Sequence, residues 1–153
     1  MNFIGERKKK MSKAALVFWS GTGNTEIMAD AVEAGIKAGG AEVEVFQAAD
    51  FDSSKVAEFD GIAFGCPSMG AEQLEESEMQ PMFDDVKDRL SGKKVVLFGS
   101  YGWGDGEWMR TWEDDCADAG ADRVADSVIC NETPDDEAKA ECKALGEALA
   151  KAL

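Results

Sequence analysis

The sequence predicts an α/β protein: a doubly wound, five-stranded parallel sheet with helices on both faces. Strand-like apolar runs alternate along the chain with segments in which apolar residues recur at helical spacing. Continuous apolar runs are typical of strands buried on both faces, and strands that alternate with helices are typical of parallel sheets. The length of 153 residues suits a single domain with its own hydrophobic core.

The first half of the chain supplies three of the expected strands. Residues 15–19 form a continuous apolar run, and the helix that follows ends at Gly39-Gly40. Val43 and Val45 alternate with glutamates, which predicts a half-exposed edge strand. A short turn then leads to a third, buried strand at residues 62–66.

The second half continues the same alternation. Pro81 suits the first position of a helix, because its missing N–H would have no intrahelical partner there. The fourth strand is expected at residues 95–99 and the fifth at residues 124–130, with a helix over residues 109–119 between them. Pro134 is expected to open the last helix.

Acidic residues outnumber basic ones by 31 to 16, which gives a formal net charge of −15. A chain this acidic repels nucleic acid and anionic lipid, and no apolar run approaches the ~20 residues of a membrane span, so neither partner is expected. Either solubility or attraction to basic partners explains the charge. Residues 1–12, with the basic run Arg7–Lys10, are expected to form a disordered extension of a domain at residues 13–153.

The cysteine and histidine content limits the chemistry. The four cysteines form no CxxC pair and three lie within apolar patterns, so buried, reduced thiols and a cytoplasmic location are expected. The chain has no histidine. This absence excludes Ser-His-Asp and Cys-His catalysis and removes the commonest metal ligand.

The loop after the first strand, Ser20–Thr25, has the composition of an anion-binding site. Its two glycines let backbone N–H groups turn inward, its hydroxyls and amide add donors, and the start of a helix adds partial positive charge. It lacks the GxxxxGK[ST] pattern of a P-loop, and Glu26 occupies the third glycine position of a dinucleotide fingerprint. An N-capped turn is the alternative, but at the switch point of a doubly wound sheet a monophosphate held by neutral donors is favoured.

Two further loops follow the third and fourth strands, at residues 67–72 and 100–106. Met69 and Glu72 flank a tight turn at Gly70, and Trp103 projects from a loop in which glycines alternate. A thioether on one side and an indole on the other suit the two faces of a flat heteroaromatic ring. The three loops together predict a ligand with such a ring at one end and a monophosphate at the other.

Three ordered runs resemble the FMN-binding loops of flavodoxins: FWSGTGNTE, GCPSMGAEQLEESE and FGSYGWGDGEW. The run NETPDD resembles the short-chain type of that family. The resemblance covers about residues 14–153 and implies non-covalent FMN and a sheet in the order 2-1-3-4-5. The cofactor-binding residues that it implies are Ser20, Gly21, Thr22, Gly23, Asn24, Thr25, Ser68, Met69, Gly70, Ala71, Glu72, Ser100, Tyr101, Gly102, Trp103 and Gly104.

The resemblance also implies roles for single residues. Met69 would pack on the inner flavin face and Trp103 on the outer face. The Gly70 carbonyl oxygen would accept a hydrogen bond from N5–H of the reduced flavin. Glu72 would contact the N3 end of the ring, and the Gly102 backbone would lie at the pyrimidine edge. The phosphate would be bound by Ser20, Thr22, Asn24 and Thr25.

Two positions depart from several relatives. Ala71 stands where they carry an acidic residue, and Pro67 stands where others carry a serine that helps to hold the phosphate. Neither change is expected to block the fold or FMN binding. The Cβ of Ala71 resists a positive φ, so the turn is expected to place that conformation at Gly70. In flavodoxins the peptide after this glycine turns over when the flavin is reduced, and a positive φ at the glycine corresponds to the turn of the reduced state. The sequence is therefore expected to favour that turn.

The expected function is that of a monomeric, low-potential one-electron carrier between a reductase donor and low-potential acceptors with basic surfaces. Seven carboxylates and one lysine lie between Glu72 and Asp88, a charge that disfavours a second electron on the flavin and attracts basic partners. The alternative is an FMN-dependent NAD(P)H:quinone reductase, although such enzymes are generally larger. A receiver domain of the same topology is excluded, because Trp19-Ser20 stands where its clustered aspartates would be.

Overall fold

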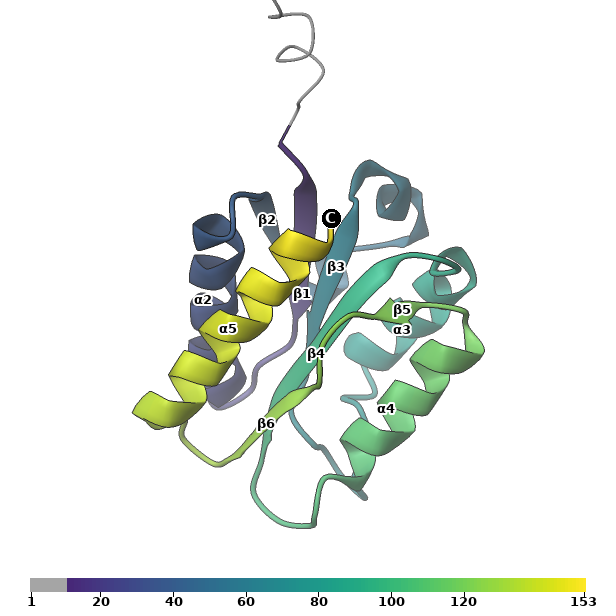
Figure 1. Ribbon diagram of the computed structural model, residues 1–153. Coiled ribbons are helices and arrows are strands. Elements are labelled where there is room, and N and C mark those ends of the chain that lie inside the picture. Colours follow the sequence, from purple (N-terminus) through teal and green to yellow (C-terminus); the bar gives the residue numbers. More distant parts are fainter. Residues whose placement is uncertain (1–10) are drawn as a thin grey trace, which may run out of the picture.

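The alternation in the sequence produces a central parallel sheet with helices on both faces (Figure 1). The computed structural model describes residues 11–153. The expectation for residues 1–10, which include the basic run Arg7–Lys10, lies outside the described residues. Met11 and Ser12, the remainder of the expected extension, precede the first strand without regular secondary structure.

The strands of the sheet are β1 Lys13–Phe18, β2 Glu42–Gln47, β3 Gly61–Gly65, β4 Lys94–Tyr101, β5 Asp122–Arg123 and β6 Val128–Asn131. They lie in the order β2-β1-β3-β4, and β4 pairs along its other edge with β5 and then with β6. Every pair is parallel. The expected order 2-1-3-4-5 is therefore confirmed, with two short strands sharing the fifth place.

The helices of the described chain are α2 Asn24–Ala38, α3 Met79–Val86, α4 Glu107–Asp118 and α5 Asp136–Ala152, with short 3-10 segments at Ala48–Asp50, Ser53–Glu58 and Lys87–Arg89. Helices α2 and α5 cover one face of the sheet, and α3 and α4 cover the other (Figure 1). Two of the 3-10 segments take the place of a helix between β2 and β3. Among residues 11–153, no helix has the length and apolar character needed to cross a bilayer.

The side chains of each strand divide between two hydrophobic cores, because successive residues of a strand point to opposite faces. In β1, Ala15 and Val17 pack in the core beneath α3 and α4, whereas Ala14 and Leu16 pack in the core beneath α2 and α5. All four side chains are completely buried. Burial on both faces explains why this strand reads as a continuous apolar run.

Helices α2 and α5 cross where each carries a glycine. A Cβ on Gly35 would lie 2.0 Å from the Lys143 carbonyl oxygen, and a Cβ on Gly146 would lie 2.2 Å from the Val32 carbonyl oxygen. Only hydrogen at these two positions allows the backbones to approach so closely. The crossing therefore holds α2, and the loop that precedes it, in place against α5.

Two strand boundaries correct the sequence prediction. Strand β4 continues through Ser100 and Tyr101, which the sequence assigns to the following loop. The single fifth strand expected at residues 124–130 is interrupted, and only its second part belongs to β6. In the interruption, the Ser127 hydroxyl donates to the Glu113 carboxylate of α4 at 2.6 Å. Such side-chain hydrogen bonds compete with the regular ladder, and apolar periodicity does not reveal them.

The two prolines that the sequence predicts at helix starts, Pro81 and Pro134, lie away from the expected positions. Pro81 is the third residue of α3, where it still belongs to the first turn and its missing N–H has no intrahelical partner. Pro134 precedes α5, whose N-cap is Asp135 with a carboxylate that accepts from the Ala138 N–H at 2.8 Å. Proline thus marks the neighbourhood of a helix start, and the capping side chain determines the first residue.

Candidate cofactor site

The three loops singled out in the sequence meet at the carboxyl edge of the sheet, around a cavity of about 290 Å³. The cavity lies where β1 and β3 feed helices on opposite faces, which is the switch point at which doubly wound sheets bind ligands. No lysine or arginine is among its lining residues. These are Trp19, Gly21, Thr22, Asn24, Pro67, Ser68, Met69, Ser100, Tyr101, Gly102 and Glu132.

The first loop is shaped by its own leading side chain. The Ser20 hydroxyl oxygen accepts from the Gly23 N–H at 3.1 Å and from the Glu26 N–H at 3.3 Å. Gly23 has a φ of +99°, which glycine adopts without steric cost. Helix α2 begins at the next residue, so its unpaired N–H groups and partial positive charge lie at the loop. The loop therefore has the donors that an anion-binding site needs, without a lysine or arginine.

Thr22 and Asn24 line the cavity, but Thr25 does not. The Thr25 side chain is buried, and its hydroxyl forms a 3.2 Å hydrogen bond with the hydroxyl of Ser100. This bond joins the start of α2 to the end of β4 and so connects the first loop with the third. A direct contact between Thr25 and a phosphate therefore stays a prediction.

The second loop is a small hairpin instead of the four-residue turn that the sequence predicts. Met69 and Gln73 form an antiparallel bridge in which each N–H donates to the other carbonyl oxygen at 2.8 Å. Gly70 has a φ of +55°, so the prediction that the positive φ falls there and not on Ala71 is confirmed. Glu72 also has a positive φ, of 54°, which the sequence did not reveal.

The side chain of Glu72 joins the second loop to the third. Its carboxylate accepts from the N–H of Glu107, the first residue of α4, at 3.0 Å. It also lies against Gly104, where an added Cβ would be 2.5 Å from Glu72 Cδ. A carboxylate at a helix N-terminus is stabilised by the helix dipole. The contact of Glu72 with a flavin N3 end stays a prediction, because this structure places its carboxylate on α4.

The third loop presents Trp103 to solvent, with 64 % of its surface exposed, whereas Trp108 is buried in the core. Arg110 fastens this loop to α4: its guanidinium donates to the Asp105 carbonyl oxygen at 3.1 Å and to the Asp105 carboxylate at 2.9 Å. The hydrogen bond with Asp105, more than any other influence, raises the pKa of Arg110. Trp103 does not itself line the cavity, although it directly follows Gly102, which does. Its contact with a flat ring therefore stays a prediction.

Three residues that line the cavity are absent from the predicted cofactor-binding set: Trp19, Pro67 and Glu132. The Trp19 indole packs on Gly21, where an added Cβ would lie 2.9 Å from it. Glu132 has a positive φ, and its N–H donates to the Tyr101 carbonyl oxygen at 2.8 Å. A signal for Trp19 exists, since it directly precedes the glycine-containing loop. Glu132 gives none, because its place depends on how β6 pairs with β4.

The described residues hold no cluster suited to a metal ion, and their four cysteines are free. Cys66, Cys116 and Cys142 are buried, as predicted, and Cys130 is half-buried. Burial raises the pKa of Cys66, Cys116 and Cys142 to about 12. These three thiols are therefore protonated and weakly nucleophilic at neutral pH.

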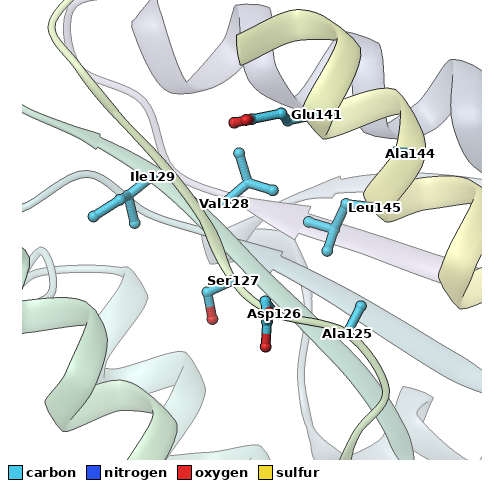
Figure 2. Close-up of a pocket in the computed structure, with 8 residues that line it drawn as sticks. All are labelled: Ala125, Asp126, Ser127, Val128, Ile129, Glu141, Ala144 and Leu145. Atoms are coloured by element: carbon cyan, nitrogen blue, oxygen red, sulfur yellow. The ribbon is translucent and has the colours of Figure 1, made fainter. Parts of the chain in front are cut away.

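A second hollow, of about 420 Å³, lies between the edge of the sheet and α5 (Figure 2). It has neither a glycine loop nor a helix N-terminus, so it offers no set of donors to an anion. Its lining is Ala125, Asp126, Ser127, Val128, Ile129, Glu141, Ala144 and Leu145. The cavity at the switch point, although smaller, is the one with binding chemistry.

The fold and the cavity together define the class of protein. The loop before α2 offers N–H and hydroxyl donors of the kind that bind one phosphate, and the cavity is also lined by Met69 and Tyr101, whose side chains are of the kind that pack on a flat ring. The described site holds no second anion-binding loop and no cation for a longer phosphate chain. These are the features of a doubly wound protein that binds a mononucleotide.

Comparison with known proteins identifies the family. The family profile named Flavodoxin matches residues 16–146. Flavodoxin from Megasphaera elsdenii is 53 % identical over 137 residues, which cover 90 % of this chain and 98 % of that protein. Flavodoxin from Clostridium beijerinckii is 42 % identical over 135 residues, covering 88 % and 97 %. The solution structure of two-electron reduced M. elsdenii flavodoxin matches with a TM-score of 0.83 at 51 % identity, covering 90 % and 98 %. The chain therefore belongs to the flavodoxin family.

Family membership gives the general function. The chain is a flavoprotein that binds FMN and transfers electrons between redox enzymes, and it is not itself an enzyme. The predictions of the fold, the cofactor and the electron-transfer function are confirmed. The quinone reductase alternative is not favoured.

Proposed function

We propose that this flavodoxin carries single electrons at low potential, with FMN held by the three loops at the switch point. The observation that carries the proposal is the neutral anion-binding loop before α2, which lines the same cavity as Met69 and Tyr101. FMN joins one phosphate to one flat ring, and these two groups are the ones that the loops suit. The proposed cofactor-binding residues are Ser20, Gly21, Thr22, Gly23, Asn24, Thr25, Ser68, Met69, Gly70, Ala71, Glu72, Ser100, Tyr101, Gly102, Trp103 and Gly104.

FMN supplies reversible one-electron chemistry when it is bound. The first loop contributes N–H and hydroxyl donors to the phosphate, without a lysine or arginine to neutralise it. Met69 and Trp103, which are 38 % and 64 % exposed, supply apolar surfaces that would exclude water from the ring. An unneutralised phosphate and a dry site both oppose added negative charge, so the second electron is held at low potential.

Carboxylates surround the proposed site and give its rim a strongly negative field. The exposed ones next to the second and third loops are Glu76, Glu78, Asp105 and Glu107. Further exposed carboxylates lie along α3, the 3-10 segment after it and α4, towards the other edge of the sheet: Asp84, Asp85, Asp88, Asp114, Asp115 and Asp118. In this second group, burial raises the pKa of Asp115 above its ordinary value; the charge of Lys87 opposes the rise, and the neighbouring carboxylates of Asp118 and Asp114 add to it. Such a rim attracts basic surfaces and raises association rates.

The proposal extends to the setting in which the protein works. The domain at residues 13–153 acts as a monomer in the cytoplasm, accepting electrons from a reductase and passing them to low-potential acceptors with basic surfaces. The free, buried cysteines suit a reducing compartment.

Cofactor analysis and potentiometry of the purified protein test this proposal. We expect one FMN per chain, no FAD, and two separate one-electron steps with the second at the lower potential. We also expect no steady oxidation of NAD(P)H in the presence of a quinone. Recovery of FAD, or sustained NAD(P)H consumption without a partner protein, would overturn it.

A further inference from the structure

The segment between β3 and α3 contains a buried carboxylate that no cofactor contact explains. Glu75 is only 6 % exposed, whereas its neighbours Glu76 and Glu78 are exposed. Burying a carboxylate is costly unless hydrogen bonds compensate it. The burial of the Glu75 carboxylate at the end of the second loop must therefore be compensated by hydrogen bonds.

The Glu75 carboxylate is fully engaged by the start of α3. One oxygen accepts from the N–H groups of Glu78 and Met79 at 2.7 and 3.0 Å. The other accepts from the Ser77 N–H at 2.8 Å and from the Ser77 hydroxyl. Burial opposes ionisation, but the hydrogen bonds from Ser77, Met79 and Glu78 outweigh it and hold the pKa of Glu75 below its ordinary value.

The backbone of Glu75 closes the base of the second loop. Its N–H donates to the Cys66 thiol sulfur at 3.4 Å, and that thiol lies 3.4 Å from the Pro67 carbonyl oxygen, to which it donates. The Cys66 carbonyl oxygen accepts from the Trp108 indole N–H at 3.1 Å. Cys66 and Glu75 are the residues on either side of the segment 67–74, so this contact joins the two ends of the loop and ties them to α4.

We propose that Glu75 is the positioning residue of the second loop, which it holds through Cys66 at one end and through α3 at the other. The inference rests on the proposed placement of the flavin ring against this loop. The hairpin bridge between Met69 and Gln73 is local, and Glu72 reaches only the tip of α4. Among the hydrogen bonds of residues 11–153, those of Glu75 link the loop both to the end of β3, through its N–H, and to the first turn of α3, through its carboxylate.

Glu75→Gln in the full chain tests the proposal, with Glu76→Gln as the matched control that removes the same charge one residue away. The new amide NH2 would face N–H donors, so the loop would lose part of its support. We expect the affinities of the apoprotein for FMN and for riboflavin to fall by the same factor, about tenfold or more, since hydrogen bonds to a charge are lost. The control should leave both affinities within about twofold.

The first one-electron potential of bound FMN separates positioning from a merely structural role. Loss of a negative charge by itself raises that potential, and Glu76→Gln should show only this small rise. A poorly held loop loses its contact with the reduced ring, so Glu75→Gln should shift the potential to more negative values. Equal affinities and an equal potential shift in the two variants would overturn the inference.

Two further measurements keep the test decisive. If Glu75→Gln does not fold, Ser77→Ala is used instead, because it removes one donor and leaves the carboxylate. A smaller potential shift in the direction expected of Glu75→Gln supports the inference. If Ser77→Ala matches Glu76→Gln in affinity and potential, the inference is overturned. Failure of the proposed site is recognised separately. In that case Thr22→Ala would weaken FMN and riboflavin equally, whatever Glu75→Gln does.

Discussion

The first and second loops of the site are held in contrasting ways. The first loop is fastened by a hydroxyl within it, since Ser20 accepts from Gly23 and from Glu26 a few residues further along. The second loop has a local bridge between Met69 and Gln73, but distant partners fix its position. Its residues reach Ser100 through the Ser68 N–H at 2.9 Å and reach α4 through the Glu72 carboxylate.

The two loops differ in this way because the two parts of the proposed ligand need different surroundings. A phosphate needs N–H donors and a helix start, and a short run of serine, threonine and glycine provides both. A ring needs two walls at a fixed separation, and walls on different strands are set by tertiary contacts. The phosphate loop should therefore tolerate changes elsewhere, whereas the ring loop should respond to them.

The largest effect should follow from a change to the crossing of α2 and α5, which holds the helix that follows the first loop. Gly146→Ala places a methyl group 2.2 Å from the Val32 carbonyl oxygen, so α2 and α5 must move apart. We expect a loss of stability of about 1–3 kcal/mol or more, as for other overpacked contacts. Urea unfolding of the apoprotein measures it. Ala34→Ser, on the exposed side of α2, is the control, and an equal small loss in both variants would contradict the close crossing.

The next effect concerns the turn of the second loop. Gly70 has a positive φ that a β-branched residue resists, so Gly70→Thr should make the first one-electron potential more negative. Ala71→Gly should shift the first potential in the same direction but less. Without the Cβ, residue 71 adopts a positive φ more easily, which favours the turn expected when the flavin is oxidised. Neither variant should greatly change the affinity for oxidised FMN. A first potential that does not move in Gly70→Thr would show that this glycine has no redox role.

Acid should weaken the second loop before it weakens the first. The pKa of Glu75 is lower in the folded protein than in the unfolded chain, where it is about 4.3. Its stabilising effect is therefore complete above that value and is lost as the pH falls through the folded pKa. Thermal unfolding measured from pH 6 to pH 3 should be less pH-dependent in Glu75→Gln than in Glu76→Gln. Identical profiles would assign the acid sensitivity to other groups.

The smallest effect is expected from the exposed acidic rim. Glu75 is buried and belongs to the fold, so only its exposed neighbours test docking. Neutralising Glu76 and Glu78 together should lower the rate of electron transfer to a basic partner and flatten its salt dependence, because steering acts over a Debye length of ~10 Å at 0.1 M ionic strength. Stopped-flow transfer rates against ionic strength measure this. Rates unaffected by the change would mean that the rim only aids solubility.

The sequence predicts those parts of the molecule that depend on local chemistry. Strand order follows from the alternation and the resemblance, and the phosphate loop follows from the residues between Ser20 and Thr25. The burial of Glu75 could not be predicted from the sequence. In such an acidic segment, nothing distinguishes a buried glutamate from an exposed one. The positive φ of Glu132 depends on the long-range pairing of β6 with β4, which leaves no periodic signal in the sequence. The bridge between Met69 and Gln73 is local, but it is too short to produce an alternating pattern.

The most direct test compares FMN with riboflavin, which lacks the phosphate, in titrations of the apoprotein. The wild type should bind FMN far more tightly than riboflavin, since each charge-assisted hydrogen bond to the phosphate contributes about 1.5–3 kcal/mol. Thr22→Ala should lower the affinity for FMN and leave that for riboflavin unchanged, whereas Met69→Ala should lower both by the same factor. If Thr22→Ala weakened the two ligands equally, the loop before α2 would not be the phosphate site, and the proposed placement of FMN in the cavity would be wrong.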